Sequence, residues 1–192
     1  TPKANGKIVK TCSCGATNGT TVLYAANKIS LSPSSCTYNG KVRKPSVVVK
    51  GSNGAAINSS YYTVSYHPAE KMKLWDKSNF KGSYYQGSVT KQFVIKPAAT
   101  SIAAIASVSK GFRVRWKEQS VQTTGYQIQY SRNSNFSNGT TVSVKNNKKT
   151  VETCKRLTGS KKYYVRVRTY KEVNGKTYYS AWSAAKTVTT KK

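Results

Sequence analysis

Acidic side chains and histidine, the groups that most enzymes use to transfer protons, are scarce in this chain. The 192 residues include a single histidine, His67, and five carboxylates: Glu70, Asp76, Glu118, Glu152 and Glu172. A glycosidase needs two carboxylates held across the scissile bond, and a serine or cysteine hydrolase needs a base with an orienting partner. Neither set is easily assembled from these residues. We therefore expect no catalytic residues and a protein that is not an enzyme.

The four cysteines are the remaining residues with reactive side chains, and they are Cys12, Cys14, Cys36 and Cys154. A disulfide from Cys36 to either Cys12 or Cys14 would fix the N-terminal segment to the residues that follow, as a secreted protein permits. The alternative is a metal knuckle that adds His67 to these three cysteines. Cys-x-Cys is not the usual zinc spacing, and calcium sites need more carboxylates, so we expect no metal and no other cofactor.

Basic residues dominate the charge of the chain. There are 33 Lys and Arg residues against 5 Asp and Glu residues, which gives a formal net charge of +28. Fourteen of the basic residues precede Ala98 and 19 follow, so the excess is not confined to a tail. A positive field of this size attracts polyanions and accelerates their capture. We expect positive surfaces on both halves of the chain.

Alternating apolar and polar residues predict β-strands along most of the sequence. Residues 47–49, 62–66 and 89–95 have this pattern, and turn sequences such as Asn39-Gly40 separate the segments. Residues 1–27 are interpreted as a small Cys-containing hairpin or as the end of a preceding repeat. No segment approaches the ~18 apolar residues that cross a bilayer, so we expect no membrane insertion.

Short motifs in residues 28–97 carry a first family resemblance. They lie at residues 38–41 (YNGK), 44–49 (KPSVVV), 62–66 (YTVSY), 85–87 (YQG) and 93–95 (FVI). In this order they resemble a repeat family of bacterial immunoglobulin-like modules, found in surface proteins and secreted hydrolases of Gram-positive gut bacteria. Residues 71–77 (KMKLWDK) depart from the family, which usually has a Gly-led alternating strand there.

Residues 98–192 resemble a fibronectin type III domain. Residues 112–116 (FRVRW) match its second strand, with Trp116 at the core tryptophan, and residues 125–130 (GYQIQY) match its third. Leu157, Gly159 and Tyr163 match the corner at which a tyrosine hydroxyl ties a loop to the sheet. The resemblance also places Cys154 at an aliphatic core position, which implies a buried free thiol.

The two resemblances together imply an all-β fold class. We expect two immunoglobulin-like β-sandwiches in tandem, with a small N-terminal hairpin. The expected domains are residues 1–27, the hairpin; 28–97, the bacterial immunoglobulin-like module; and 98–192, the fibronectin type III-like module.

Two arginines of the third segment have neighbours that suggest a structural role. Strand alternation directs Arg166 and Arg168 outward, and residues 179–183 (YSAWS) are similar to the Trp-Ser-x-Trp-Ser element of cytokine-receptor fibronectin modules. In that element, guanidinium groups stack between aromatic rings, here Tyr179 and Trp182. We interpret the four side chains as a structural cation–π ladder, with direct ligand contact as the alternative.

Other basic residues are candidates for binding a ligand. Arg113 and Arg115 point outward from a strand that, by the topology of the fibronectin family, lies in the opposite sheet. Trp75 lies where the first module departs from its family, and its ring could stack on a sugar. The complete candidate set is Arg113, Arg115, Lys161, Lys162, Lys41, Arg43, Lys44 and Trp75.

These features predict a non-catalytic adhesive or spacer module at the cell surface or outside the cell. The expected partner is an anionic polysaccharide or wall polymer, such as teichoic acid or a sulfated or sialylated glycan, and extracellular DNA would bind without sequence specificity. The alternatives are a receptor that captures a host protein such as immunoglobulin through an exposed strand edge, and a mechanical stalk that displays another domain. A nucleic-acid regulator inside the cell ranks last, because no recognition motif is present.

Overall fold

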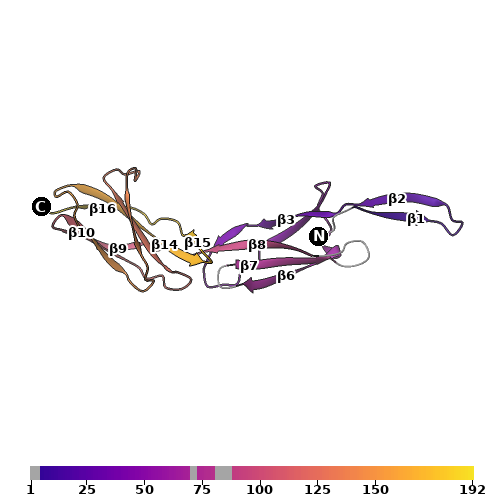
Figure 1. Cartoon of the computed structure of the whole chain (residues 1–192), viewed down its shortest axis with the longest axis horizontal. Coiled ribbons are helices and arrows are strands. Elements are labelled where there is room, and N and C mark those ends of the chain that lie inside the picture. Colours follow the sequence, from indigo (N-terminus) through magenta and orange to yellow (C-terminus); the bar gives the residue numbers. More distant parts are fainter. Residues whose placement is uncertain (1–4, 70–72, 81–87) are drawn as a thin grey trace. The chain divides into compact units, whose positions relative to one another are not determined.

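Strands account for nearly all the regular structure of this chain, as Figure 1 shows. The computed structural model describes residues 5–69, 73–80 and 88–192. It divides the chain into a first unit, within Thr1–Cys36 and Val42–Ile95, and a second unit, Thr37–Lys41 and Lys96–Lys192. The expected all-β fold is confirmed. Within the described residues, no helix is long and apolar enough to cross a membrane.

The N-terminal hairpin consists of β1 (Gly6–Thr11) and β2 (Thr17–Leu23), which pair antiparallel. Its turn is closed by a hydrogen bond from the Cys12 N–H to the Ala16 carbonyl oxygen, at 3.0 Å. Gly15 lies in this turn with a φ of +82°, a conformation that glycine adopts without a steric penalty. At the other end of the hairpin, Asn5 Oδ1 accepts hydrogen bonds from the Ala25 N–H and the Ser52 hydroxyl.

The rest of the first unit contains two sheets. The smaller pairs β3 (Ala26–Ser32) with β5 (Ser46–Gly51), and the larger has the order β4 (Ser35–Thr37), β8 (Ser88–Lys96), β7 (Lys73–Phe80), β6 (Tyr62–Ala69). A short 3₁₀ helix, η1 (Ser59–Tyr61), precedes β6. The buried core cluster includes Ile29, Val49, Ile57 and Tyr62. Because every second residue of a strand faces this core, Val48 between Val47 and Val49 is exposed.

The second unit is also built from two sheets. One has the order β13 (Val151–Cys154), β10 (Gly111–Trp116), β9 (Ile102–Val108). The other has the order β12 (Thr140–Val144), β11 (Gly125–Ser131), β14 (Lys162–Val173), β15 (Lys176–Tyr179), and β16 (Lys186–Thr189) also pairs with β14. Residues from both sheets meet in a single hydrophobic core.

Alternation along β10 and β14 decides which side chains reach this core and which reach solvent. Phe112, Val114 and Trp116 on β10 are buried, as are Val165 and Val167 on β14. The arginines between them therefore point to the outer faces of their sheets.

Trp116 and Tyr163, the two aromatic residues that the sequence placed at conserved positions of the fold, make specific contacts. The ring of Trp116 packs against Tyr126, with 5.2 Å between the ring centroids. The hydroxyl of Tyr163 accepts a hydrogen bond from the Thr158 N–H at 3.3 Å, which ties the loop before β14 to the sheet.

Candidate anion-binding surfaces

Arg113 and Arg115 lie side by side on the outer face of the three-stranded sheet. Both are exposed, and they lie two positions apart on β10, which corresponds to about 7 Å. Their neighbours on β9 are small, because Arg113 lies opposite Ala106 and Arg115 lies opposite Ala104. The two arginines and these alanines line a shallow hollow of about 160 Å³. From the β9 side, an anionic group can therefore approach both guanidinium groups without meeting a bulky side chain.

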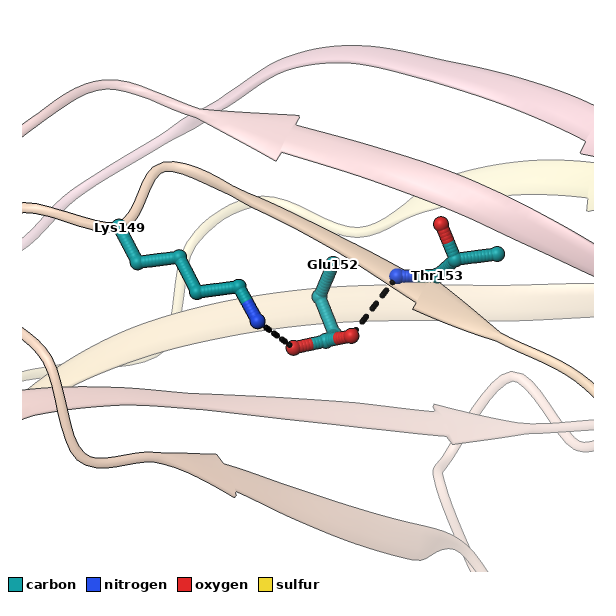
Figure 2. A network of polar contacts seen from close by, with 3 residues as sticks. All are labelled: Lys149, Glu152 and Thr153. Carbon is teal, nitrogen blue, oxygen red and sulfur yellow. Dashed lines mark hydrogen bonds and ion pairs between the residues drawn. The ribbon is translucent and has the colours of Figure 1, made fainter.

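The acidic residue on the adjacent strand does not neutralise this pair. Glu152 on β13 lies opposite Val114, whose side chain faces the core, whereas Arg113 lies opposite Thr153. Figure 2 shows Glu152 Oε2 bound to the Lys149 ammonium at 2.7 Å and Oε1 accepting a hydrogen bond from the Thr153 N–H at 3.0 Å. Among the residues that the structure describes, Lys149–Glu152 is the only ion pair.

The environment of Glu152 keeps it ionised. Burial raises the pKa of this carboxyl group, but the hydrogen bonds from Lys149 and Thr153 outweigh burial and hold the pKa below its ordinary value. The Glu152 carboxylate is thus paired with Lys149 and forms no ion pair with Arg113 or Arg115.

The other basic candidates are distributed over separate places. Lys161 and Lys162 lie at the start of β14, in the other sheet of the second unit, and Lys162 Nζ lies 5.2 Å from the centroid of the Tyr164 ring. Lys41 is exposed in the segment Thr37–Lys41, which belongs to the second unit, whereas Arg43 and Lys44 belong to the first. Lys162 therefore belongs to a different sheet from Arg113 and Arg115.

Trp75 lies in the segment of the first unit that departs from the family pattern. Residues 73–77 of this segment belong to β7, and Trp75 is paired with His67 on β6 and Gln92 on β8. The strand places Trp75 in the middle of a four-stranded sheet. Its side chain lies outside what the structure describes, so its role as a sugar-stacking residue stays a prediction.

The cation–π ladder forms on the outer face of the five-stranded sheet. The guanidinium carbon of Arg168 lies 3.8 Å from the ring centroid of Tyr179 and 4.2 Å from that of Trp182. The corresponding carbon of Arg166 lies 4.6 Å from the Trp182 centroid. All four side chains named from the sequence are therefore in contact as expected. Burial lowers the pKa of both arginines from the ordinary value.

Three members of this arrangement were missed by the sequence reasoning. Phe136 stacks on Arg166 with 4.0 Å between the guanidinium carbon and the ring centroid. Gln129 Oε1 accepts hydrogen bonds from Arg166, and Gln127 Oε1 accepts two from Arg168, at 3.0 and 2.8 Å. The alternation of residues 126–130 (YQIQY) was a signal for the glutamines, since it directs both to the outer face beside the arginines.

Because two rings and an amide oxygen hold the Arg168 guanidinium, Arg168→Met should lower the free energy of unfolding of the second unit. We expect a loss of about 1–2 kcal/mol, from two cation–π contacts and a charge-assisted hydrogen bond. Urea unfolding followed by circular dichroism measures the change. Lys162→Met, which removes one exposed cation–π contact, is the matched control and should cost less than about 0.5 kcal/mol. Equal effects of the two substitutions would contradict a structural ladder.

The disulfide of the structure differs from the predicted pairing. Cys12 bonds Cys14, with 5.2 Å between their Cα atoms, and Cys36 is a free, half-buried thiol. The prediction that Cys36 pairs with Cys12 or Cys14 is therefore wrong. The physical reason is the position of the turn: Cys12 and Cys14 lie at the tip of the hairpin, about 20 Å along the strands from its base at Asn5.

Cys154 is a buried free thiol in the core of the second unit, as the family resemblance implied. Burial raises its pKa to about 12, and the nearby charge of Glu152 adds to the shift. The thiol is therefore protonated and unreactive at neutral pH. Among the described residues, no cluster of His, Cys, Asp and Glu side chains could hold a metal ion.

Comparison with known proteins identifies the second unit. A family model described as "Fibronectin type III domain" matches residues 96–186. Residues 96–186 are a fibronectin type III domain. Domains of this family are generally non-catalytic, typically extracellular, and suited to adhesion or spacing. In this fibronectin type III domain, Arg113 and Arg115 occupy the face of the three-stranded sheet, and the ladder occupies the face of the other sheet.

Two solved structures similar to the chain are a β-1,2-glucanase from Parabacteroides distasonis and the FN1–FN3 domains of chicken CNTN1. The glucanase match has a TM-score of 0.40 and 17% identity, and it covers 58% of this chain and 17% of that chain. The CNTN1 match has a TM-score of 0.44 and 15% identity, and it covers 80% of this chain and 53% of that chain. The chain thus spans about half or less of the length of these proteins. No curated protein matches it.

Proposed function

We propose that the chain is an extracellular adhesive or spacer module that binds anionic polymers through its basic surface. The observation that supports this best is the exposed pair Arg113 and Arg115, which lie over small residues and have no carboxylate partner among the described residues. The polymers that fit are teichoic acid of a cell wall, sulfated or sialylated glycans, and DNA outside the cell. The net charge of +28 attracts all of them over a longer range.

The proposed binding consists of many weak ionic contacts, with little geometric selection among polymers. The guanidinium groups point outward from the sheet and are spaced as alternate residues of a strand. They lie over a shallow hollow that does not enclose a ligand. Each contact releases a counterion from the polymer, so the affinity should fall steeply as salt is added. Arg113 and Arg115 concentrate two of these contacts within about 7 Å.

The double substitution R113Q/R115Q should weaken binding to heparin and to double-stranded DNA about tenfold, which corresponds to about 1.4 kcal/mol. For DNA, the slope of log affinity against log salt should become shallower by about 1.8, since each lost phosphate contact contributes about 0.9. Biolayer interferometry between about 50 and about 200 mM NaCl measures both quantities.

The matched control is K145Q/K148Q, which removes the same charge from two exposed lysines of the loop after β12. It should weaken binding less than R113Q/R115Q does at every salt concentration. Equal losses for the two variants would show that only the net charge matters and would refute the assigned surface. No retention of the unmodified chain on heparin, DNA or wall polymer would refute polymer binding and favour a mechanical stalk.

A further inference from the structure

The first unit contains a hollow of about 600 Å³ with mostly apolar walls. Those walls are formed by Pro33, Val42, Pro45 and Phe93. A volume of this size is within the range of pockets that hold small organic ligands. It shares no residue with the hollow at Arg113 and Arg115 in the second unit.

Two cations also line this hollow. Arg43 and Lys44 are adjacent in sequence and both contribute to its surface. Of the described residues that line it, none is acidic, so their charge is not neutralised from within the hollow. A cationic lining on apolar walls favours a ligand that carries both a negative charge and an apolar group.

The Arg43 side chain contains a buried donor with no partner. Its Nε is inaccessible to solvent and makes no hydrogen bond within the part of the chain that the structure describes. Buried donors of this kind are rare, because an unsatisfied donor loses its hydrogen bond to water without replacement. The edge of a guanidinium that carries Nε is one of the edges that pair bidentately with a carboxylate. A carboxylate bound to Arg43 would supply the missing acceptor once the side chain turns Nε toward it.

The wall around Arg43 is held in place by its neighbours. Tyr66 donates a hydrogen bond from its hydroxyl to the Pro45 carbonyl oxygen at 2.7 Å, and Lys44 Nζ lies 5.9 Å from the centroid of the same tyrosine ring. Phe93 is 1% exposed and is therefore held in place by its neighbours. The hollow is thus formed before any ligand binds, which lowers the entropic cost of binding.

We propose that this hollow is a binding site for a small organic carboxylate with an apolar body, in which Arg43 pairs with the carboxylate and the apolar walls contact the apolar part. A carboxylate suits the site better than a phosphate dianion, because transferring a single charge into mostly apolar surroundings costs less. This site does not depend on polymer binding by Arg113 and Arg115.

Cys36 provides a reporter for this site, because its thiol also lines the hollow. Burial raises the pKa of Cys36, and the nearby charge of Arg43 partly offsets this, so the alkylation is carried out at alkaline pH, where more of the thiol is ionised. The other three cysteines do not interfere in the absence of a reducing agent. Cys12 and Cys14 are bonded to each other, and Cys154 is buried.

The experiment measures the rate at which iodoacetamide alkylates Cys36 in the full chain, by mass spectrometry, with phenylacetate as the probe. Phenylacetate should slow the alkylation with a half-maximal effect at about 1 mM, as expected for a ligand of about ten non-hydrogen atoms. Phenylacetamide lacks the charge and acetate lacks the ring, so each should protect at least about tenfold more weakly. Equal protection by phenylacetate and phenylacetamide would overturn the proposal, as would no protection by phenylacetate.

Two variants complete the test. Arg43→Gln should abolish protection by phenylacetate, and Arg43→Lys, which keeps the charge but loses the paired donors, should weaken it at least about fivefold. In R113Q/R115Q, phenylacetate should protect Cys36 from alkylation as well as it does in the unmodified chain. The amide signals of β5 in an NMR spectrum show whether each Arg43 variant is folded. Protection that persists in a folded Arg43→Gln chain would refute the assignment of Arg43.

Discussion

Replacing Trp116 with alanine should lower the free energy of unfolding of the fibronectin type III domain by about 3–5 kcal/mol. Trp116 is 2% exposed and belongs to the core cluster formed by both sheets. Its removal leaves a cavity that the surrounding strands can fill only in part, because the backbone of β10 is paired on both sides. A loss of this size is a large fraction of the stability of a domain of this length.

Urea unfolding followed by circular dichroism measures the effect of Trp116→Ala, and the slope with urea shows whether the transition stays two-state. Trp116→Phe is the control, because it keeps an aromatic ring against Tyr126 and should cost less than half as much. If both variants lowered the free energy of unfolding by a similar small amount, Trp116 would not be a main source of the stability of this core.

Replacing Gly125 with alanine should cost about 3 kcal/mol, by crowding rather than by a cavity. The added Cβ would overlap the carbonyl oxygen of Val144 and would lie 3.0 Å from the ring of Tyr170. The oxygen belongs to the backbone of β12, which is held in register with β11 at the adjacent pair Tyr126 and Val144. It cannot move aside without breaking that pairing, so the strain falls on the sheet.

The control for Gly125→Ala is Gly175→Ala, at a turn where the added Cβ meets nothing within 4 Å. Gly175 has a φ of +72°, so its substitution costs only the backbone strain of about 1 kcal/mol. Thermal unfolding monitored by circular dichroism compares the two variants. A melting temperature of Gly125→Ala equal to or above that of Gly175→Ala would contradict the crowding at Val144.

The second unit was the more predictable half of the chain. Its strands β10 and β14 alternate clearly, and Trp116 and Tyr163 are specific markers of their positions. Alternation also placed Arg166 and Arg168 correctly on the outer face. Phe136 could not be found in this way, because it lies in a loop with a φ of +61° and has no strand period to place it.

The first unit shows where pattern reasoning fails. Cysteine spacing alone could not reveal that Cys12 and Cys14 share a turn, because the pairing depends on where the hairpin reverses. The departure from the expected pattern did not prevent a strand at residues 73–77, since β7 pairs on both sides. The hollow beside Arg43 was also not predictable, because its walls come from segments as distant as Pro33 and Phe93.

The bridge between Cys12 and Cys14 encloses a single residue, and this has a consequence for how the protein resists denaturation. Such a small ring removes little freedom from the unfolded polypeptide, so it contributes little through loop-closure entropy. With Cys36 and Cys154 unpaired, no covalent crosslink joins one sheet to another in either unit. Folding of both units therefore depends on side-chain burial and strand pairing, and it should proceed equally well in reducing and oxidising surroundings.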